Sequence, residues 1–227
     1  GGTKDWGDAP PYHLLGKQAF ASRAAEFALG NSGAGFGAQA GQLKGGLGSA
    51  STMLDADVCV GALLAVNPVG AVCDAHGTFW VQHLALNHKG VPEFGRADAQ
   101  APQAGASHPL AASKLSGLTA GANTTIGVVA VAADLTPAEC QRVAIMAQDG
   151  LARAIRPVHS PFDGDTIFVL ATGSKPLARA AEMRPLALTV LGALAADCVA
   201  RAIARAVWFA DDTGFAPAYR SRFPKAE

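Results

Sequence analysis

The sequence predicts a layered domain of the α+β or α/β class, in which helices cover a β-sheet. Apolar, β-branched runs typical of buried strands alternate with longer segments of helical periodicity. The chain has 227 residues, 50% of them hydrophobic, which is enough to form one substantial core. Its 18 basic and 18 acidic residues balance, which argues against a nucleic acid partner. No apolar run reaches about 18 residues without a charge, which argues against a membrane-spanning helix.

The first 90 residues contain one predicted helix and two predicted strands. Residues 14–29 place apolar side chains on one side of a helix, which the following glycines end. Residues 31–51 hold so many glycines that we expect no regular element there. They include a loose G-x-G-x-x-A pattern, but a dinucleotide-binding loop requires a strand before it and a helix after it, and neither is predicted. Residues 58–72 predict two strands joined by a bend at Asn67-Pro68.

A break in composition precedes the second half of the chain. Residues 91–122 are rich in Pro, Ala, Gly and Ser, and they predict a long flexible connection. A strand follows over residues 125–132. A helix then begins with Thr136 as its N-cap, Pro137 in the first turn and Glu139 as the acid of a capping box.

This helix runs to about residue 154, and two more elements follow it. Residues 166–171 predict a strand after the polar turn HSPFDGD. Residues 186–210 predict a long helix that is apolar on more than one side, so we expect it to be buried between layers.

The cysteines and histidines do not form a predicted metal site. The four cysteines share no C-x-x-C spacing and sit in apolar stretches, so we expect small buried side chains in a reducing compartment: Cys59, Cys73, Cys140 and Cys198. His83 and His88 lie close in sequence but lack the i, i+4 spacing of a helical metal pair.

The break in composition ends at Asn123-Thr124-Thr125, directly before a predicted strand. If the bond between Asn123 and Thr124 were cut, Thr124 would carry both a hydroxyl and a free α-amine. The pKa of a terminal amine is ordinarily far lower than that of a Lys side chain, so this amine can act as the base that activates its own hydroxyl. Before the cut, the same hydroxyl is placed to attack the upstream carbonyl. The residues also fit an N-x-[ST] glycosylation acceptor or an ordinary strand start.

Four further polar residues are candidates for a site. Asp163 and Asp165 flank a glycine before a predicted strand; they fit a surface turn, or two carboxylates aimed at one site. Lys44 stands between glycines and is either solvated or able to approach a substrate closely. Asn67 lies in an apolar run, where a buried amide requires partners and its NH₂ group could donate to an oxyanion.

One combination of stretches extends over most of the chain, from about Leu14 to Arg205: GAGFGAQAGQLKGGLGSAS, AVNPVGAV, residues 121–173 and LGALAADCVARAI. This combination resembles the self-processing N-terminal-nucleophile hydrolases. That family groups L-aminopeptidase/D-amino-acid esterases, β-peptidyl aminopeptidases and the nylon-oligomer (6-aminohexanoate oligomer) endohydrolase. A threonine with Asn before it and Thr after it is more similar to the nylon-oligomer branch than to the serine-bearing aminopeptidases.

The resemblance implies an α+β fold, a four-layer αββα sandwich assembled into a homotetramer. It implies a precursor that cuts itself between Asn123 and Thr124 into an α part, residues 1–123, and a β part, residues 124–227. Thr124 would be the nucleophile. The other implied site residues are Asp163 and Asp165, which support the nucleophile and its amine, and Lys44 and Asn67, which fall where the family has a lysine and an oxyanion-stabilising asparagine.

We therefore predict a self-cleaving amide hydrolase that acts on peptide-like or nylon-type oligoamides through an acyl-enzyme on Thr124, with no cofactor and no metal. The alternatives are a β-aminopeptidase or D-amino-acid esterase with the same nucleophile, an acyltransferase, and a non-catalytic relative. The expected partners are an amide substrate and the two fragments of the chain, with no nucleic acid and no membrane.

We expect a cytoplasmic protein. Family members carry a segment upstream of Gly1 that includes an oxyanion-stabilising tyrosine, and neither Tyr12 nor Tyr219 stands in the matching context. Either a further cut places that segment in another chain, or this sequence begins late, in which case a targeting signal could have preceded it.

Overall fold

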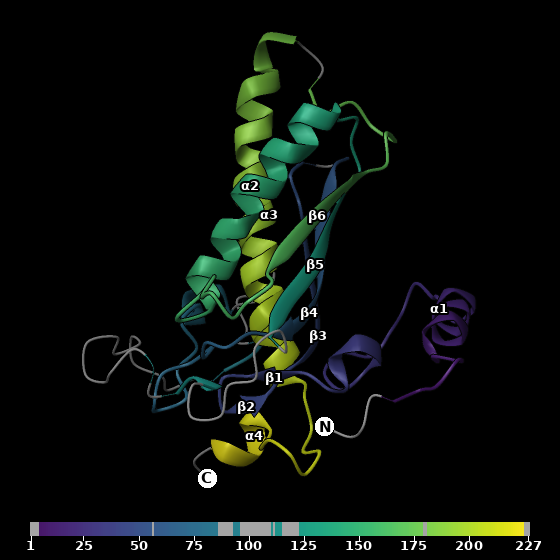
Figure 1. The fold of residues 1–227 in the computed structure, drawn as a ribbon. Coiled ribbons are helices and arrows are strands. Elements are labelled where there is room, and N and C mark those ends of the chain that lie inside the picture. The colour runs from purple at the N-terminus through teal and green to yellow at the C-terminus, as the bar shows by residue number, and fades with distance from the viewer. Residues whose placement is uncertain are drawn as a thin grey trace.

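The computed structural model is built around one sheet with the strand order β3-β4-β5-β6 (Figure 1). The strands are β3 (Gly46–Met53), β4 (Cys59–Asn67), β5 (Thr124–Val131) and β6 (Thr166–Ala171). The pairs β3–β4 and β4–β5 are antiparallel, whereas β5 and β6 are parallel because a crossover helix connects them. The structure describes residues 5–55, 57–85, 93–95, 110, 112–114, 123–178 and 181–224.

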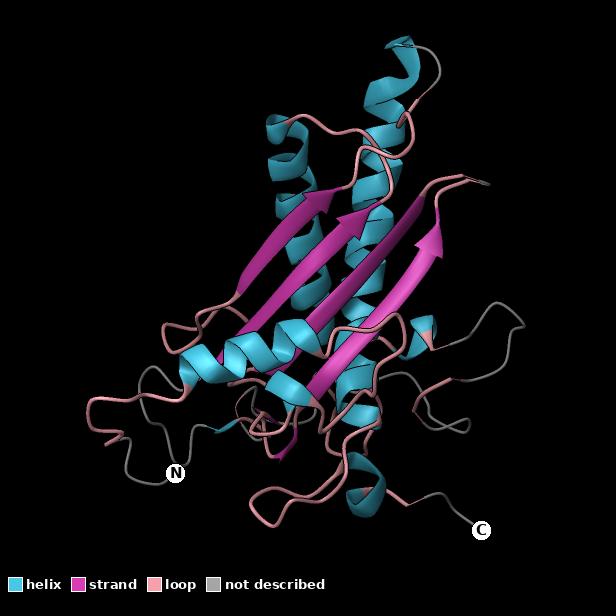
Figure 2. Cartoon of the chain, turned by 90° about the vertical axis from the view of Figure 1, so that its right-hand side faces the viewer, coloured by secondary structure: helices cyan, strands magenta, loops and turns pink. Residues whose placement is uncertain are grey.

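Two long helices, α2 (Pro137–Ala154) and α3 (Arg184–Trp208), cover one face of this sheet. In Figure 2 the strands lie in front and both helices lie behind them. In the two central strands, β4 and β5, residues on the helix side are buried in strict alternation, as expected for a sheet that is covered on one face. The core between the sheet and the helices includes Val60, Leu64, Val129, Val143, Leu151 and Ile203.

The other face of the sheet is open in the described part of the chain. Large apolar side chains on this face are exposed: Met53, Ile126, Phe168 and Leu170. In the described part of the chain, the four-stranded sheet is therefore covered by one helical layer.

Shorter elements gather at one end of the sheet, except for one turn before α3. The helices are α1 (Tyr12–Ala21) and α4 (Tyr219–Arg222), and the short strands β1 (Gln39–Ala40) and β2 (Leu43–Lys44) pair with each other. The 3₁₀ helices are η1 (Gly33–Gly35), η2 (Gln82–Leu84) and η4 (Ala181–Met183).

The elements of the second half agree with the predictions from sequence. The strand β6 has the predicted bounds, and the long helix α3 is displaced by only two residues at each end from the predicted residues 186–210. The capping box of α2 is formed: Thr136 Oγ1 accepts a hydrogen bond from the backbone N–H of Glu139, whose carboxylate accepts one from the N–H of Thr136.

The prediction of no regular element over residues 31–51 is wrong, because β3 begins at Gly46. Glycine is required there by packing and not by a loop. A Cβ on Gly48 would lie 1.9 Å from the carbonyl oxygen of Ala202, and one on Gly46 would lie 2.4 Å from that of Ala206. The glycines allow the backbone of α3 to rest directly on the strand.

Two other predicted elements differ from the structure. The first helix is shorter than residues 14–29, because it ends at Ala21 and has no buried residue to stabilise it. Residues 58–72 form one strand instead of two; β4 ends at Asn67, and only isolated bridges at Ala71 and Cys73 follow. Most of the predicted flexible connection, residues 91–122, lies outside the described residues.

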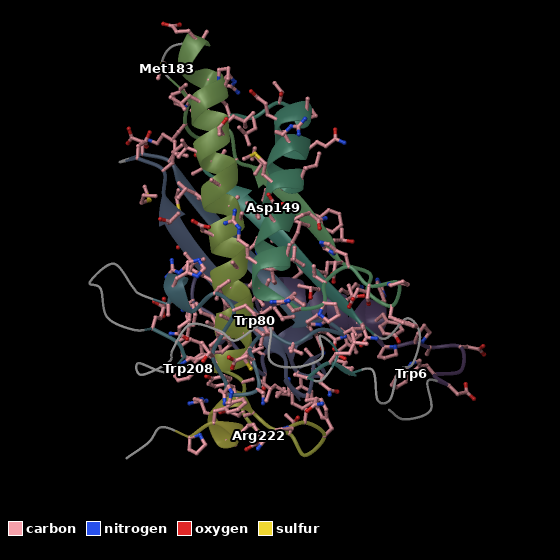
Figure 3. The ribbon with its side chains drawn as sticks, turned by 90° about the vertical axis from the view of Figure 1, so that its left-hand side faces the viewer. Trp6, Trp80, Asp149, Met183, Trp208 and Arg222 are labelled. Carbon is pink, nitrogen blue, oxygen red and sulfur yellow. The ribbon has the colours of Figure 1, made fainter. Side chains whose placement is uncertain are left out.

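The helix α3 is the central core helix. Together with η4 it is long and apolar enough to cross a membrane by length and composition, yet half of its most apolar stretch is buried inside the protein. It packs against α2, β3 and β4. Figure 3 shows Met183 and Trp208 at its two ends. This packing accounts for its apolar character.

Candidate functional site

The end of β4 meets the beginning of β5 at the predicted junction. Thr124 is the first residue of β5 and pairs with Asn67, the last residue of β4. Thr125 is fully buried on the helix side, so the alternation of a strand places the side chains of Thr124 and Asn67 together on the open face. The fold thus brings together two predicted site residues that are far apart in sequence.

The hydroxyl of Thr124 lies against the peptide bond that it is predicted to attack. Thr124 Oγ1 donates a hydrogen bond to the carbonyl oxygen of Asn123 at 2.5 Å. The backbone N–H of Gly164 donates to the same oxygen at 3.1 Å. A parallel bridge between Asn123 and Asp163 extends the pairing of β5 and β6 through this junction. The carbonyl therefore has a backbone donor in place before any reaction.

Asp165 is hydrogen-bonded to Thr125, the residue that follows Thr124. Its Oδ1 accepts a hydrogen bond from the N–H of Thr125 at 2.7 Å, and its Oδ2 lies 2.9 Å from Nδ1 of His159. Its carboxylate is almost completely buried, whereas the ring of His159 is partly exposed. The carboxylate of Asp165 is therefore held in place by its neighbours and is not a solvated group on an exposed turn.

Asp163 holds the loop that follows Asn67. Its Oδ1 accepts a hydrogen bond from the N–H of Val69 at 2.9 Å. Its Oδ2 accepts bonds from the N–H and the hydroxyl of Ser160, at 3.0 and 2.5 Å. The two carboxylates thus fix the ends of β4 and β5 from two sides.

The amide of Asn67 has a defined orientation. Its Oδ1 accepts hydrogen bonds from the N–H of Gln39 at 3.0 Å and from Nζ of Lys114 at 2.9 Å. Because both partners are donors, the oxygen must face them and the NH₂ group must face the other way. The oxygen of the amide is therefore held by two donors, one from β1 and one from Lys114.

Lys44 is fully buried and not solvated. Its Nζ donates to the carbonyl oxygens of Gly35 and Gly45, both at 2.7 Å. Burial lowers the pKa of Lys44 to about 8. Lys44 pairs across β1–β2 with Gln39, whose N–H binds Asn67. Among the described residues, the structure therefore links Lys44 to Asn67 through the backbone of Gln39 and not through its ammonium group.

Lys114 and His159 are site residues that the sequence reasoning missed. Lys114 lies in the predicted flexible connection, and no periodic or motif signal marks it. Its Nζ lies 3.0 Å from Oδ1 of Asn123 and close to both oxygens of Asn67. His159 stands in the polar turn before the Asp163–Asp165 pair, where its nearness in sequence was an available signal.

The described residues contain no group of three His, Cys, Asp or Glu side chains that could hold a metal ion. His83 is exposed, and His88 lies outside the described part. All four cysteines are free thiols, and burial raises the pKa of Cys73 and Cys198 to about 12. Tyr219 is a core residue stacked on Phe79.

Comparison with known proteins gives relatives along nearly the whole chain. A family model described as peptidase family S58 matches residues 9–218. An uncharacterized aminopeptidase of Mycobacterium tuberculosis is 45% identical over 220 residues, which are 93% of this chain and 62% of that protein. A 6-aminohexanoate-oligomer endohydrolase of Kocuria sp. is 30% identical over 158 residues, which are 65% of this chain and 40% of that protein. The chain thus spans less than two thirds of these relatives.

Two solved structures share the fold. A β-aminopeptidase of Burkholderia sp. has a TM-score of 0.60 at 22% identity, over 95% of this chain and 57% of that one. An L-aminopeptidase D-Ala-esterase/amidase of Ochrobactrum anthropi, described as a variant of the Ntn hydrolase fold, has a TM-score of 0.56 at 22% identity, over 89% of this chain and 52% of that one. The predicted α+β fold of the N-terminal-nucleophile type is thereby confirmed; the described residues form two of its layers.

Proposed function

The chain belongs to peptidase family S58, and from this premise we propose that it is an amide hydrolase that cuts itself between Asn123 and Thr124. Thr124 then acts as the nucleophile on peptide-like or nylon-type oligoamides. The observation that carries the proposal is the 2.5 Å contact between the Thr124 hydroxyl and the carbonyl oxygen of Asn123. This contact supports the proposal because it keeps the hydroxyl next to the carbonyl group that it would attack, and an intramolecular reaction depends on such proximity.

The self-cleavage proceeds in two steps. Thr124 Oγ1 attacks the carbonyl carbon of Asn123, the N–H of Gly164 donates to the oxyanion, and the hydroxyl proton passes to the departing nitrogen of Thr124. The amide C–N bond breaks and an ester forms. Water then hydrolyses the ester, which leaves a carboxylate on Asn123 and restores the hydroxyl of Thr124, now beside a free α-amine.

Turnover repeats this chemistry on a substrate. The α-amine of Thr124 accepts the hydroxyl proton and returns it to the leaving amine, and the acyl-enzyme ester is resolved by water. Asp165, bonded to the N–H of Thr125, fixes the start of β5, and Asp163 fixes the loop after Asn67. The NH₂ group of Asn67 stabilises the oxyanion, and Lys44 supports Asn67 through its strand pairing with Gln39.

A second candidate is an exo-acting aminopeptidase with the same nucleophile, since the relative that is 45% identical is named an aminopeptidase. An exo-acting enzyme requires a free ammonium group on its substrate, whereas an endo-acting one does not. Oligoamides with blocked and unblocked amino ends separate the two. Product analysis with an added amine acceptor tests an acyltransferase.

The same proposal includes the assembly. The two parts, residues 1–123 and 124–227, stay associated because β4 and β5 pair across the junction. We place the protein in the cytoplasm as a homotetramer, a state that light scattering on the purified protein measures.

Denaturing mass spectrometry tests the proposal. The protein is expected to give two fragments, one of which begins Thr-Thr-Ile, and Thr124→Ala is expected to stay uncut and inactive. Thr125→Val is the matched control, because it removes a neighbouring buried hydroxyl that has no hydrogen-bond partner among the described residues, and it is expected to be cut normally. If Thr124→Ala is cut at the same bond, or if the active protein is uncut, the proposal is wrong.

A further inference from the structure

The side chain of Lys114 connects two groups of the site. Its Nζ lies 2.9 Å from Oδ1 and 3.2 Å from the carbonyl oxygen of Asn67, and 3.0 Å from Oδ1 of Asn123. A lysine ammonium has three N–H donors, and these three acceptors use all of them. Lys114 therefore fixes the donor Asn67 and the residue before the scissile bond relative to each other.

The backbone around Lys114 is fixed independently of this contact. The N–H of Lys114 donates to the carbonyl oxygen of Val69 at 3.0 Å, in the loop that also binds Asp163. The carbonyl of Ala112 accepts from the N–H of Gln42 at 3.2 Å. A lysine that carries its own anchored backbone holds its partners more firmly than one on a free chain end, since less conformational freedom is lost on contact.

The charge of Lys114 suits this position. Partial burial lowers its pKa to about 8, and the nearby carboxylate of Asp163 opposes this shift. Its three acceptors are neutral oxygens, so the ammonium polarises the amide groups of Asn67 and Asn123 without being neutralised by an ion pair.

We propose that Lys114 is a positioning residue for the self-cleavage: it holds Asn123 so that its carbonyl faces both the hydroxyl of Thr124 and the N–H of Gly164, while it turns the amide of Asn67 toward the reaction. This inference rests on the proposed self-cleavage. It assigns to Lys114 a contribution to the first reaction of the protein.

The first experiment measures the rate of self-cleavage in the full-length protein by intact mass over time. Lys114→Met is expected to slow it about 100-fold, the effect of a misplacement near 1 Å. Lys175→Met, at an exposed lysine on the far end of the sheet, is the matched control and is expected to leave the rate unchanged. Asn123→Ala removes one of the three contacts, and the double variant with Lys114→Met is expected to be slowed by less than the product of the two single effects, because coupled residues are not additive.

The second experiment restores the amine. In Lys114→Cys, aminoethylation of the new thiol gives a side chain of nearly the length and charge of lysine, and it is expected to start cleavage in protein that was folded and uncut. A protein alkylated at position 114 that stays folded and uncut would overturn the inference, as would wild-type cleavage rates in Lys114→Met or in Asn123→Ala. Failure of the underlying proposal has a different signature, since the unmodified protein itself would then be uncut.

Discussion

Substituting Gly164 by alanine tests the geometry of the junction most directly. A Cβ at this position would lie 2.8 Å from Thr124 Oγ1 but 3.7 and 3.8 Å from Cγ2 and Cβ of the same residue. Ordinary contact begins at 3.4 Å, so the methyl group displaces the hydroxyl by about 0.6 Å and leaves the rest of Thr124 in place. Gly164 does not have a left-handed φ, so alanine fits the backbone there.

The displaced hydroxyl has little room to recover its position. Threonine is stiff at χ1, and the backbone of Thr124 is fixed by its pairing with Asn67. Because a misplacement of about 1 Å costs about 100-fold in rate, we expect Gly164→Ala to slow self-cleavage by about 10- to 100-fold. Intact mass spectrometry during expression and after purification measures the fraction cut over time.

The control is Gly61→Ala, on β4 of the same sheet, where the new Cβ would lie 3.4 Å from the Cβ of Ser51. It is expected to be cut at the normal rate. Urea unfolding of both variants in the Thr124→Ala background checks that the fold is retained. If Gly164→Ala is cut as fast as the unmodified protein, the hydroxyl does not occupy the position described for it, and the reasoning from this contact fails.

Three further predictions follow from other parts of the molecule. Asn67→Asp keeps the shape and the acceptor but removes the NH₂ donor, so kcat on an activated amide is expected to fall about 100- to 1000-fold, and an unchanged kcat would exclude the oxyanion role. Burial lowers the pKa of Lys44 to about 8, below its unfolded value, so the unfolded chain binds more protons above pH 8 and the free energy of unfolding rises with pH. In the Thr124→Ala background, Lys44→Met is expected to reduce this slope by up to about 1.4 kcal/mol per pH unit, as urea unfolding between pH 7.5 and 10 measures. Thr136→Ala removes the N-cap of α2 and is expected to lower the free energy of unfolding in urea by about 1 kcal/mol, with no change in the rate of self-cleavage. A slower self-cleavage in this variant would mean that α2 acts on the site.

Local signals were sufficient for the second half of the fold. The cap at Thr136 and the apolar run of β6 lie within a few residues of the elements that they define, so the sequence predicts them well. The strand β3 was missed because its glycines are explained only by the backbone of α3, which lies about 150 residues later in the chain. Composition indicates a loop wherever glycine is frequent, and only the tertiary contact reverses that conclusion.

The site divides in the same way. The junction at Thr124 follows from a contrast in composition, and the roles of Asp163, Asp165 and Asn67 followed from a family resemblance. Lys114 was beyond both kinds of evidence, because its partners Asn67 and Asn123 meet it only when β4 and β5 pair. The full burial of Lys44 was missed for a different reason: its partners are backbone carbonyls of Gly35 in η1 and of the adjacent Gly45, and backbone groups leave no signal in the sequence.

The position of the junction at the very start of β5 has a consequence for handling the protein. A break there removes no strand, because β5 keeps β4 and β6 as neighbours. The fold is then divided between two polypeptides, with β1, β2, β3 and β4 on one and β5, β6 and both long helices on the other. Renaturation of a processed subunit becomes a bimolecular reaction whose yield depends on protein concentration, whereas the subunit of an uncut chain folds without a second fragment. A processed protein would thus keep its fold while it stays native, but it would refold less readily after denaturation.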